Sequence, residues 1–400
     1  MLMPLTTNVN RFNKVTLMDR RQFNMGLGAG LISAGLAGRA TAQARYRGPN
    51  IILVRFGGGV RRAETIEAAT TYAPYMRHVL AERGVLIPNM VISQMEGGNT
   101  SHAEGTLNIL TGRYEAYRDA GSGLLDDRLE PTEPTLFEYL REAFDIPSHQ
   151  VLLVNGEDRA QEEFFTYGMH GHYGINYRSE MLSLHRFKLH KFARILEEGG
   201  LDGAGQQAAE KAYADLLAAD HREIVPQQSG PLQQFWDGWR AHYGDDGFKN
   251  PRGDRLLTAL ALKAMEELRP RLMMINYQDP DYVHWGNASH YTRAISVIDD
   301  GLRQLVEAVD HSDHYSGNTI FVVVPDCGRD ANDLMSVPYQ HHFNSRSAHE
   351  IWALIFGAGI ARNRVIEREV DQTAIASTIA ALMGFRAGRS EGDVLSGISA

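Results

Sequence analysis

The stretch TIFVVVPDCGRDAND, from Thr319 to Asp333, passes from an apolar run into a polar turn. Its run of apolar residues, Ile320 to Val324, is typical of a strand buried on both faces of a sheet. Pro325 ends the run, and the turn that follows carries Asp326 and Cys327, the only cysteine in the chain. Polar side chains placed directly after a buried strand are the first candidates for a functional site.

Similar apolar runs recur along the chain and alternate with amphipathic segments. Further strands are predicted at residues 50–56, 84–92, 149–156, 271–278 and 350–360. Helical segments are predicted at residues 70–84, 135–144, 259–270, 291–309 and 371–385. This alternation predicts an α/β fold with a doubly wound, mostly parallel sheet and helices on both faces.

The character of the sequence changes between about residue 157 and residue 253. This part is polar and rich in Gln and Ala, it contains FWDGWRAHYG (235–244), and it has no strong apolar run. We interpret it as a helical insertion. Because no internal repeat or low-complexity linker is visible, residues 45–400 are expected to form one domain that carries this insert.

Composition and charge narrow the class of function. With 43% hydrophobic and 22% charged residues, the chain is of the soluble globular type. The formal net charge is −9 and no polybasic run occurs, so a nucleic-acid partner is not expected. A single cysteine excludes an internal disulfide and any CxxC motif. A small-molecule ligand is the expected partner.

The N-terminus predicts export. Arg20 and Arg21 precede a Gly/Ala-rich, mildly apolar segment that ends in the small residues ATAQA (40–44). We interpret residues 1–44 as a twin-arginine signal peptide, because the apolar segment is too short for a standard transmembrane helix. The twin-arginine translocase is then a partner during export, and the mature protein is expected in the periplasm, or anchored to the membrane if the signal is uncleaved.

Acidic and histidine side chains gather where predicted strands end. Asp281 and His284 follow the strand at 271–278, Asp326 follows the opening stretch, and His342 lies shortly downstream of it. Such a set is typical of the ligands of a zinc-like or manganese-like ion, so a metal or catalytic role is predicted for these four residues. Other loop histidines are interpreted as surface or capping residues: His290, His311, His314 and His349.

The segment NTSHAEGTLNILTGR (Asn99–Arg113) reads as a turn followed by a helix. Thr100 or Ser101 lies just before the helix, where a hydroxyl can cap free backbone amides. The same position, beside metal ligands, suits a nucleophile that attacks at the positive end of a helix. The sequence leaves both interpretations open.

The sequence resembles the alkaline phosphatase superfamily, which includes phosphatases, phosphodiesterases, phosphoglycerate mutases and sulfatases. The resemblance rests on the order of five motifs rather than on any one of them. They are the first apolar strand, GNTSHAEGTLNILTGR, DYVHWG with YTRAISVIDDGLRQL, VVVPDCGRD, and HHF followed by HEIWALIFGAGI.

The resemblance implies two metal positions. Asp281, His284 and His342 would form the first, with Asp279 and His341 as alternatives. Asp326 would belong to the second, where Cys327 stands in the place of a histidine and VRFGGGVRR (54–62) has glycines in the place of a carboxylate. Cys327 is either a thiolate ligand or an inert buried thiol. One tightly bound zinc, manganese or calcium ion is therefore expected rather than two.

The resemblance also implies an activity. We expect an exported, metal-dependent hydrolase of phosphate esters, or less readily of sulfate esters, with Thr100 or Ser101 as the nucleophile. Asn99, Arg61 and Arg113 are expected to bind the substrate, and Arg55 and Arg62 are further candidates for clamping its oxyanion. The alternative is a non-catalytic member of the fold that acts as a binding protein, because two ligands of the second position are altered.

Overall fold

The computed structural model describes residues 45–94, 100–119, 129–156, 165–168, 171–219, 228–247, 252–331, 339–341 and 345–400. The predicted signal peptide, residues 1–44, lies outside these ranges, as do Asn99 and His342. Among the helices that are described, none combines the length and the apolar character needed to cross a membrane.

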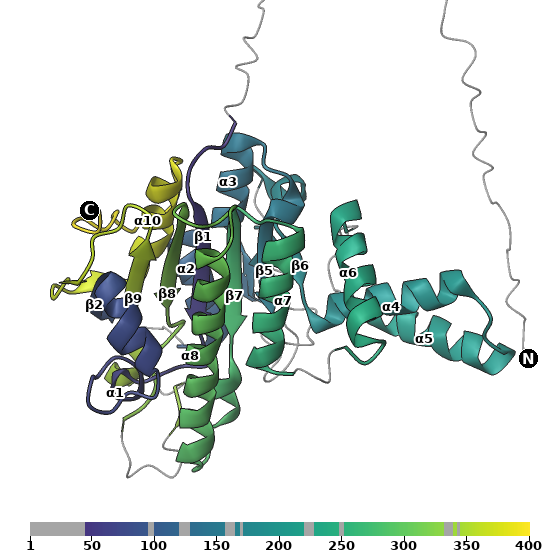
Figure 1. The fold of residues 1–400 in the computed structure, drawn as a ribbon, viewed down its shortest axis with the longest axis horizontal. Helices are drawn as coiled ribbons and strands as arrows, with labels where there is room; N and C mark the ends of the chain where they lie inside the picture. The colour runs from purple at the N-terminus through teal and green to yellow at the C-terminus, as the bar shows by residue number, and fades with distance from the viewer. Residues whose placement is uncertain are drawn as a thin grey trace, which may run out of the picture. The chain divides into compact units, whose positions relative to one another are not determined.

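In the part of the chain that the structure describes, a nine-stranded sheet forms the centre of the fold (Figure 1). Its strand order is β10-β2-β9-β8-β1-β7-β5-β6, and β11 pairs with β2. The first strand of the chain, β1 (Asn50–Phe56), lies between β8 (Thr319–Val324) and β7 (Leu272–Tyr277) and is parallel to both. The carboxyl ends of these three strands therefore lie at one edge of the sheet.

The other strands extend the sheet on both sides. β5 (Val151–Asn155) is parallel to β7, and β9 (Glu350–Gly357) is antiparallel to β8 and to β2 (Gly84–Val91). The short strands are β6 (Glu180–Leu182), β10 (Arg364–Val365) and β11 (Val370–Asp371), with β3 (Tyr117–Asp119) and β4 (Leu129–Pro131) as a separate antiparallel pair. The mostly parallel sheet confirms the predicted fold class, whereas the reversed direction of β9 was not predicted.

The longer helices follow the predicted segments except at residues 70–84, and the short helices at residues 62–65 and 346–349 were not predicted. They are α1 (Arg62–Thr65), α2 (His102–Thr111), α3 (Leu136–Phe144), α4 (Leu184–Glu198), α5 (Gly203–Ala219), α6 (Gly230–Tyr243), α7 (Asp254–Glu267), α8 (Ala288–Asp310), α9 (Arg346–His349) and α10 (Ala374–Met383). The segment predicted as a helix at 70–84 forms a π-helical turn (Met76–Leu80) and a 3₁₀ turn (Ala81–Arg83). Pro74 is the first helical residue, a position where its missing amide hydrogen is tolerated, so the helical turns begin at Pro74 rather than at residue 70.

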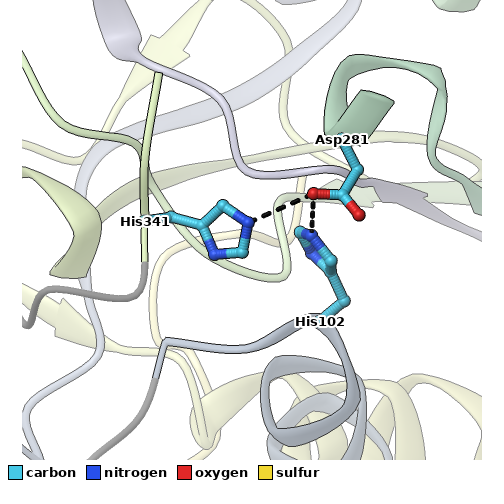
Figure 2. A group of neighbouring side chains, drawn as sticks. All are labelled: His102, Asp281 and His341. Atoms are coloured by element: carbon cyan, nitrogen blue, oxygen red, sulfur yellow. Dashed lines mark hydrogen bonds and ion pairs between the residues drawn. The ribbon is translucent and has the colours of Figure 1, made fainter. Parts of the chain in front are cut away.

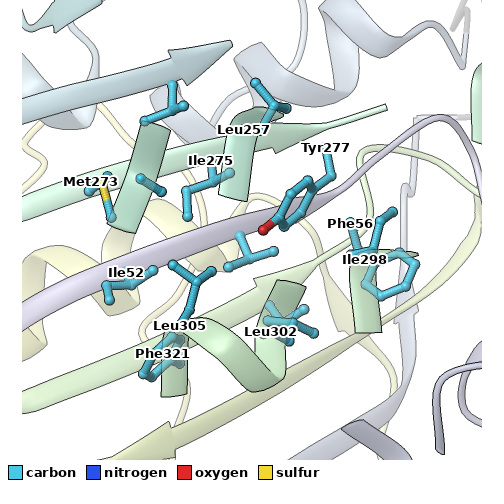
Figure 3. Packing of buried hydrophobic residues seen from close by; sticks show 14 of the residues in the cluster. Ile52, Phe56, Leu257, Met273, Ile275, Tyr277, Ile298, Leu302, Leu305 and Phe321 are labelled. Atoms are coloured by element: carbon cyan, nitrogen blue, oxygen red, sulfur yellow. The ribbon is translucent and has the colours of Figure 1, made fainter. Parts of the chain in front are cut away.

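Helices cover both faces of the sheet because alternate strand side chains point to opposite faces. Ile52 and Phe56 of β1 pack with residues of α7 and α8, and Figure 3 shows this cluster around Tyr277. Ile51 and Leu53 of the same strand pack with residues of α2, α3 and α10 on the other face. Both faces of β1 are thus buried in apolar side chains, which explains its nearly uninterrupted apolar sequence.

The described part of the predicted insertion is mostly helical. It contains α4, α5 and α6, and aromatic residues of α4 and α6, among them Phe187, Trp236 and Trp239, join the apolar cluster that includes α7 and α8. The same stretch also contributes β6, which pairs parallel with β5 at the edge of the main sheet. Three residues are too short a run to give a strand signal in the sequence.

Candidate metal centre

Asp281 lies in a 3₁₀ turn (Asp279–Tyr282) that follows β7. Its Oδ1 oxygen is 2.7 Å from His102 Nε2, 3.0 Å from His284 Nε2 and 3.2 Å from His341 Nε2. Figure 2 shows the rings of His102 and His341 approaching this oxygen from two different segments. One carboxylate oxygen therefore brings together three imidazole rings.

Asp326 follows β8 and is fully buried. Its Oδ1 oxygen accepts hydrogen bonds from the backbone amides of Cys327, at 2.8 Å, and Gly59, at 3.3 Å. Its Oδ2 oxygen lies 2.7 Å from His102 Nδ1 and 3.8 Å from Arg55 Nε. Since backbone amides hold one oxygen, the other is oriented toward His102.

His102 lies at the centre of the site, because its two ring nitrogens face two different carboxylates. It is the first residue of α2, and Gly105 explains how the helix reaches the end of β8. A Cβ added at Gly105 would lie only 2.2 Å from the carbonyl oxygen of Asp326, so the backbone of α2 packs directly against that residue. Sequence reasoning missed His102, although a histidine in the first helical turn with a glycine three residues later was visible.

The charges of the site are strongly coupled. Burial would lower the pKa of His102, but the carboxylates of Asp281 and Asp326 outweigh it and raise this pKa well above the ordinary value. Burial opposes ionisation of Asp281, yet His102, with hydrogen bonds from His284 and His341, holds its pKa far below the usual range. Burial also opposes ionisation of Asp326, but His102 and Arg55 lower its pKa to about 2. Two carboxylates therefore enclose a protonated imidazole.

Cys327 adjoins this cluster. Its side chain is fully buried, and its Sγ atom lies 3.9 Å from His102 Nδ1. Burial, followed by the charge of Asp326, raises the pKa of the thiol to about 11. A bound cation would favour the thiolate, so the position suits a ligand, while the burial also suits an inert thiol.

Thr100 and Ser101 lie at the start of α2, as the sequence indicated. The Ser101 hydroxyl caps the helix, accepting a hydrogen bond from the amide of Glu104 at 3.2 Å and donating to its carboxylate at 3.1 Å. The Thr100 hydroxyl donates to the carbonyl oxygen of His341, and Thr100 is almost completely buried. Within the described chain, neither hydroxyl is hydrogen-bonded to Asp281.

The arginines expected to bind substrate are held by other groups. Arg61 forms hydrogen bonds of 3.0 and 2.7 Å with the Glu64 carboxylate. Arg113 pairs with Glu391 at 2.5 Å and with Glu133 at 3.6 Å. These contacts give both guanidinium groups structural partners near the ends of α1 and α2.

The other two arginine candidates are also bonded. Arg55 is buried and donates to the hydroxyl of Thr106 at 2.7 Å, so it lies beside α2 and near Asp326. Arg62 donates to the carbonyl oxygen of Ile351 at 3.0 Å, away from these contacts. Of these four arginines, Arg55 is the one whose guanidinium approaches a carboxylate that contacts His102, namely that of Asp326.

The two alternative ligands, His341 and Asp279, lie in different places. His341, the alternative to His342, lies in the cluster around Asp281. The carboxylate of Asp279 instead lies against Gly253, where an added Cβ would be 2.7 Å from its Oδ1 atom. His349, expected at the surface, is buried at the end of α9, with Nδ1 2.9 Å from the carbonyl oxygen of Ser345.

Arg329 holds the site segments together. Its guanidinium is fully buried and lies over the ring of Tyr291, with Cζ 5.2 Å from the ring centroid. It donates to backbone carbonyl oxygens of three segments, namely Gly58, Gly59, Pro280, Val283 and Tyr339. These segments follow β1, flank Asp281 and precede His341. One side chain thus fixes the spacing of the candidate ligands.

The residues present fit a divalent cation. Among the described residues, two groups have donor atoms within 4.8 Å of one another: His102 with Asp281 and His341, and His102 with Asp326 and Cys327. Imidazole and carboxylate suit zinc or manganese, and a thiolate suits zinc. Several imidazole nitrogens lie close to single carboxylate oxygens in this site. A bound cation would arrange these atoms as ligands of one coordination sphere.

Comparison with known proteins identifies the fold. No protein-family model matches the chain, and no curated protein matches it in sequence. The structure is similar to that of a protein in the alkaline phosphatase superfamily from Vibrio parahaemolyticus, with 14% identity, a TM-score of 0.53, and coverage of 90% of this chain and 72% of that one.

Two further structures support this result. The wild-type alkaline phosphatase PafA has 11% identity and a TM-score of 0.54, with coverage of 89% of this chain and all (100%) of PafA. The 2-O GAG sulfatase BT1596 has 12% identity and a TM-score of 0.51, with coverage of 88% of this chain and 74% of that one. The chain therefore has the fold of the alkaline phosphatase superfamily, as the order of its sequence motifs indicated.

Proposed function

We propose that this protein is a metal-dependent hydrolase of phosphate esters, and less readily of sulfate esters, exported by the twin-arginine pathway. The observation that carries the proposal is the convergence of Asp281 and Asp326, from the ends of two parallel strands, on His102. His341, His284 and Cys327 complete the cluster. Ligands of this kind at the carboxyl edge of a parallel sheet are suited to a catalytic cation.

The first group, His102 with Asp281 and His341, would hold the catalytic ion. A bound divalent cation would supply Lewis-acid polarisation of the ester. Asp281 is the ligand with the most open side chain, at 29% exposure, whereas His341 and Asp326 are fully buried. Substrate therefore reaches the site from the side of Asp281.

The proposed nucleophile is the hydroxyl of Thr100 or Ser101. Its oxygen attacks phosphorus and displaces the alcohol, which takes up the hydroxyl proton, and water then cleaves the phosphoryl-enzyme and restores the hydroxyl. Attack requires the hydroxyl to leave its present acceptor, which is the His341 carbonyl for Thr100 and the Glu104 carboxylate for Ser101. The N-terminus of α2 then faces the negative charge of the phosphoryl group.

A non-catalytic binding protein is the second candidate. The observation that favours it is that both hydroxyls are engaged in hydrogen bonds with the chain itself. Such a protein would bind a cation and an anionic ligand without turning it over. The two functions differ in turnover and share metal binding.

The proposal is tested with protein purified from the periplasm. Chromogenic phosphomonoesters, phosphodiesters and sulfate esters are offered with zinc, with manganese and with chelator. We expect hydrolysis of a phosphate ester that chelator removes, and a loss of more than about 100-fold in Asp281→Asn. His311→Ala, which changes an exposed histidine at the end of α8, is the control. Metal binding without turnover of any ester would favour the binding protein.

A further inference from the structure

The two potential ligand groups share one residue. His102 belongs to the group with Asp281 and His341 and also to the group with Asp326 and Cys327. A histidine shared in this way either serves one ion at a time or joins two ions. The geometry of its ring nitrogens distinguishes these possibilities.

Each ring nitrogen faces a different group. Nε2 lies 2.7 Å from Asp281 Oδ1, on the side of His341. Nδ1 lies 2.7 Å from Asp326 Oδ2 and 3.9 Å from Cys327 Sγ. The two nitrogens of an imidazole point in divergent directions, so no single ion can bind both of them.

The ring has little freedom to choose another orientation. His102 is the first residue of α2, and Gly105 of that helix is packed against the backbone of Asp326. The centroids of the His102 and His341 rings are 4.4 Å apart. The carboxylate of Asp326 is itself fixed by the amides of Cys327 and Gly59. Both donor directions of His102 are thus preset by the fold.

We propose that His102 is a bridging imidazole ligand that joins two metal ions. One ion binds Nε2 with Asp281 and His341, and the second binds Nδ1 with Asp326 and Cys327, each ion replacing one ring proton. The thiolate makes the second position selective for a zinc-type ion. This inference rests on the proposed function only in that the site binds metal, and it changes the expected stoichiometry from one tightly bound ion to two.

The bridge sets the distance between the ions. With metal–nitrogen bonds of about 2.0–2.1 Å on both sides of the ring, the ions lie roughly 6 Å apart. Two ions that clamp one phosphoryl group are about 3.5–4 Å apart. The ion at Cys327, whose donors Asp326 and Cys327 are fully buried, therefore has a supporting role, and the ion at the more open Asp281 faces substrate.

Zinc content after exhaustive dialysis tests the bridge without any substrate. We expect two zinc ions per wild-type chain, one in Cys327→Ser and one in Asp281→Asn, because each of these variants removes a ligand of one position only. His102→Ala should lose both ions on dialysis, since it removes a ligand of each position. The control His311→Ala should keep both ions. A His102→Ala protein that loses only one ion, or none, would overturn the bridge.

A second measurement uses wild-type protein and so does not depend on a variant that folds. X-ray absorption at the zinc edge should show sulfur bound to half of the zinc and a zinc–zinc distance of roughly 6 Å. A distance of about 3.5–4 Å, or one zinc per chain at saturation, would overturn the proposal. A bridged pair without ester turnover would refute the proposed function alone, and turnover with a single bound ion would refute the bridge alone.

Discussion

Thr100 and His341 are tied to each other by two contacts. The Thr100 hydroxyl donates to the carbonyl oxygen of His341, and the Thr100 carbonyl oxygen lies 2.8 Å from His341 Nδ1. Because a carbonyl oxygen only accepts hydrogen bonds, Nδ1 donates to Thr100, and Nε2 is directed at Asp281. A proposed nucleophile thus orients a proposed metal ligand.

Substitution of the two hydroxyl residues identifies the nucleophile. If Thr100 attacks the ester, Thr100→Val should lower kcat by more than about 100-fold, and Thr100→Ser should restore much of it. Ser101→Ala should instead cost about 1 kcal/mol of unfolding free energy, because it removes the cap of α2, with a small effect on kcat. The opposite pattern would assign the attack to Ser101. Full activity in both variants would refute a hydroxyl nucleophile.

Arg329→Met should lower the unfolding free energy by at least about 3 kcal/mol, because buried carbonyl oxygens lose their donor. The substitution should also weaken zinc binding, since the segments that carry Asp281 and His341 lose the side chain that links them. Chemical denaturation and zinc titration measure the two effects.

Arg346→Met is the matched control for this substitution. The Arg346 side chain is 88% exposed, and its pair with Glu350 lies at the surface, so its removal should change stability by less than about 0.5 kcal/mol. Equal effects of the two substitutions would show that Arg329 does not hold the site together.

Gly105→Ala should disturb the site although it adds a single methyl group. The new carbon would meet the Asp326 carbonyl oxygen, so α2 must move away, at a cost of about 1–3 kcal/mol or more. Zinc binding should fall with stability because His102 moves with the helix. Gly203→Ala, in α5 with no atom within 4 Å of the added carbon, should keep or raise stability. Unchanged zinc binding in Gly105→Ala would contradict the packing argument.

The effect of metal on stability should depend on pH. The raised pKa of His102 stabilises the metal-free protein below about pH 6.5, and this contribution is lost as the pH rises through the raised pKa. Metal binding displaces ring protons, so metal affinity rises over the same range. The fall in Tm caused by chelator should therefore be larger at about pH 9 than at about pH 6. An equal or smaller fall at the higher pH would contradict the pKa of His102.

We expect export to depend on the paired arginines of the N-terminus. Replacing Arg20 and Arg21 by lysine should leave the precursor in the cytoplasm, because the twin-arginine translocase reads the arginine pair. Cell fractionation followed by immunoblotting measures the distribution. A variant that reaches the periplasm as efficiently as the wild type would show that another signal directs export.

Much of the fold could be read from the sequence because its central strands are buried on both faces. Ile51 to Val54 and Ile320 to Val324 are continuous apolar runs, and a run of this kind predicts a central parallel strand. Asp281 and Asp326 could be found for the same reason, since each follows such a strand. The direction of β9 could not be predicted, because a fully buried strand reads alike in both orientations.

His102 shows why one residue of the site escaped prediction. Its partners Asp281 and Asp326 are far away in the sequence, and only the close packing at Gly105 brings the helix to them. A histidine in the first turn of a helix, even with a glycine three residues later, does not indicate which strand ends it will meet. The hydrogen bonds of Arg329 could not be predicted either, because Arg329 donates them to backbone carbonyl oxygens, which every residue possesses.

The central place of β1 in the sheet governs the order in which the chain can fold. Both of its neighbours, β7 and β8, belong to the last third of the sequence, so β1 leaves the ribosome long before either partner exists. Closing such long loops is slow, and the apolar strand is open to aggregation until then. Protein synthesis that stops before Thr319 yields a chain without β8, Asp326 or His341. Only a nearly finished polypeptide can form both the central sheet and the candidate metal centre.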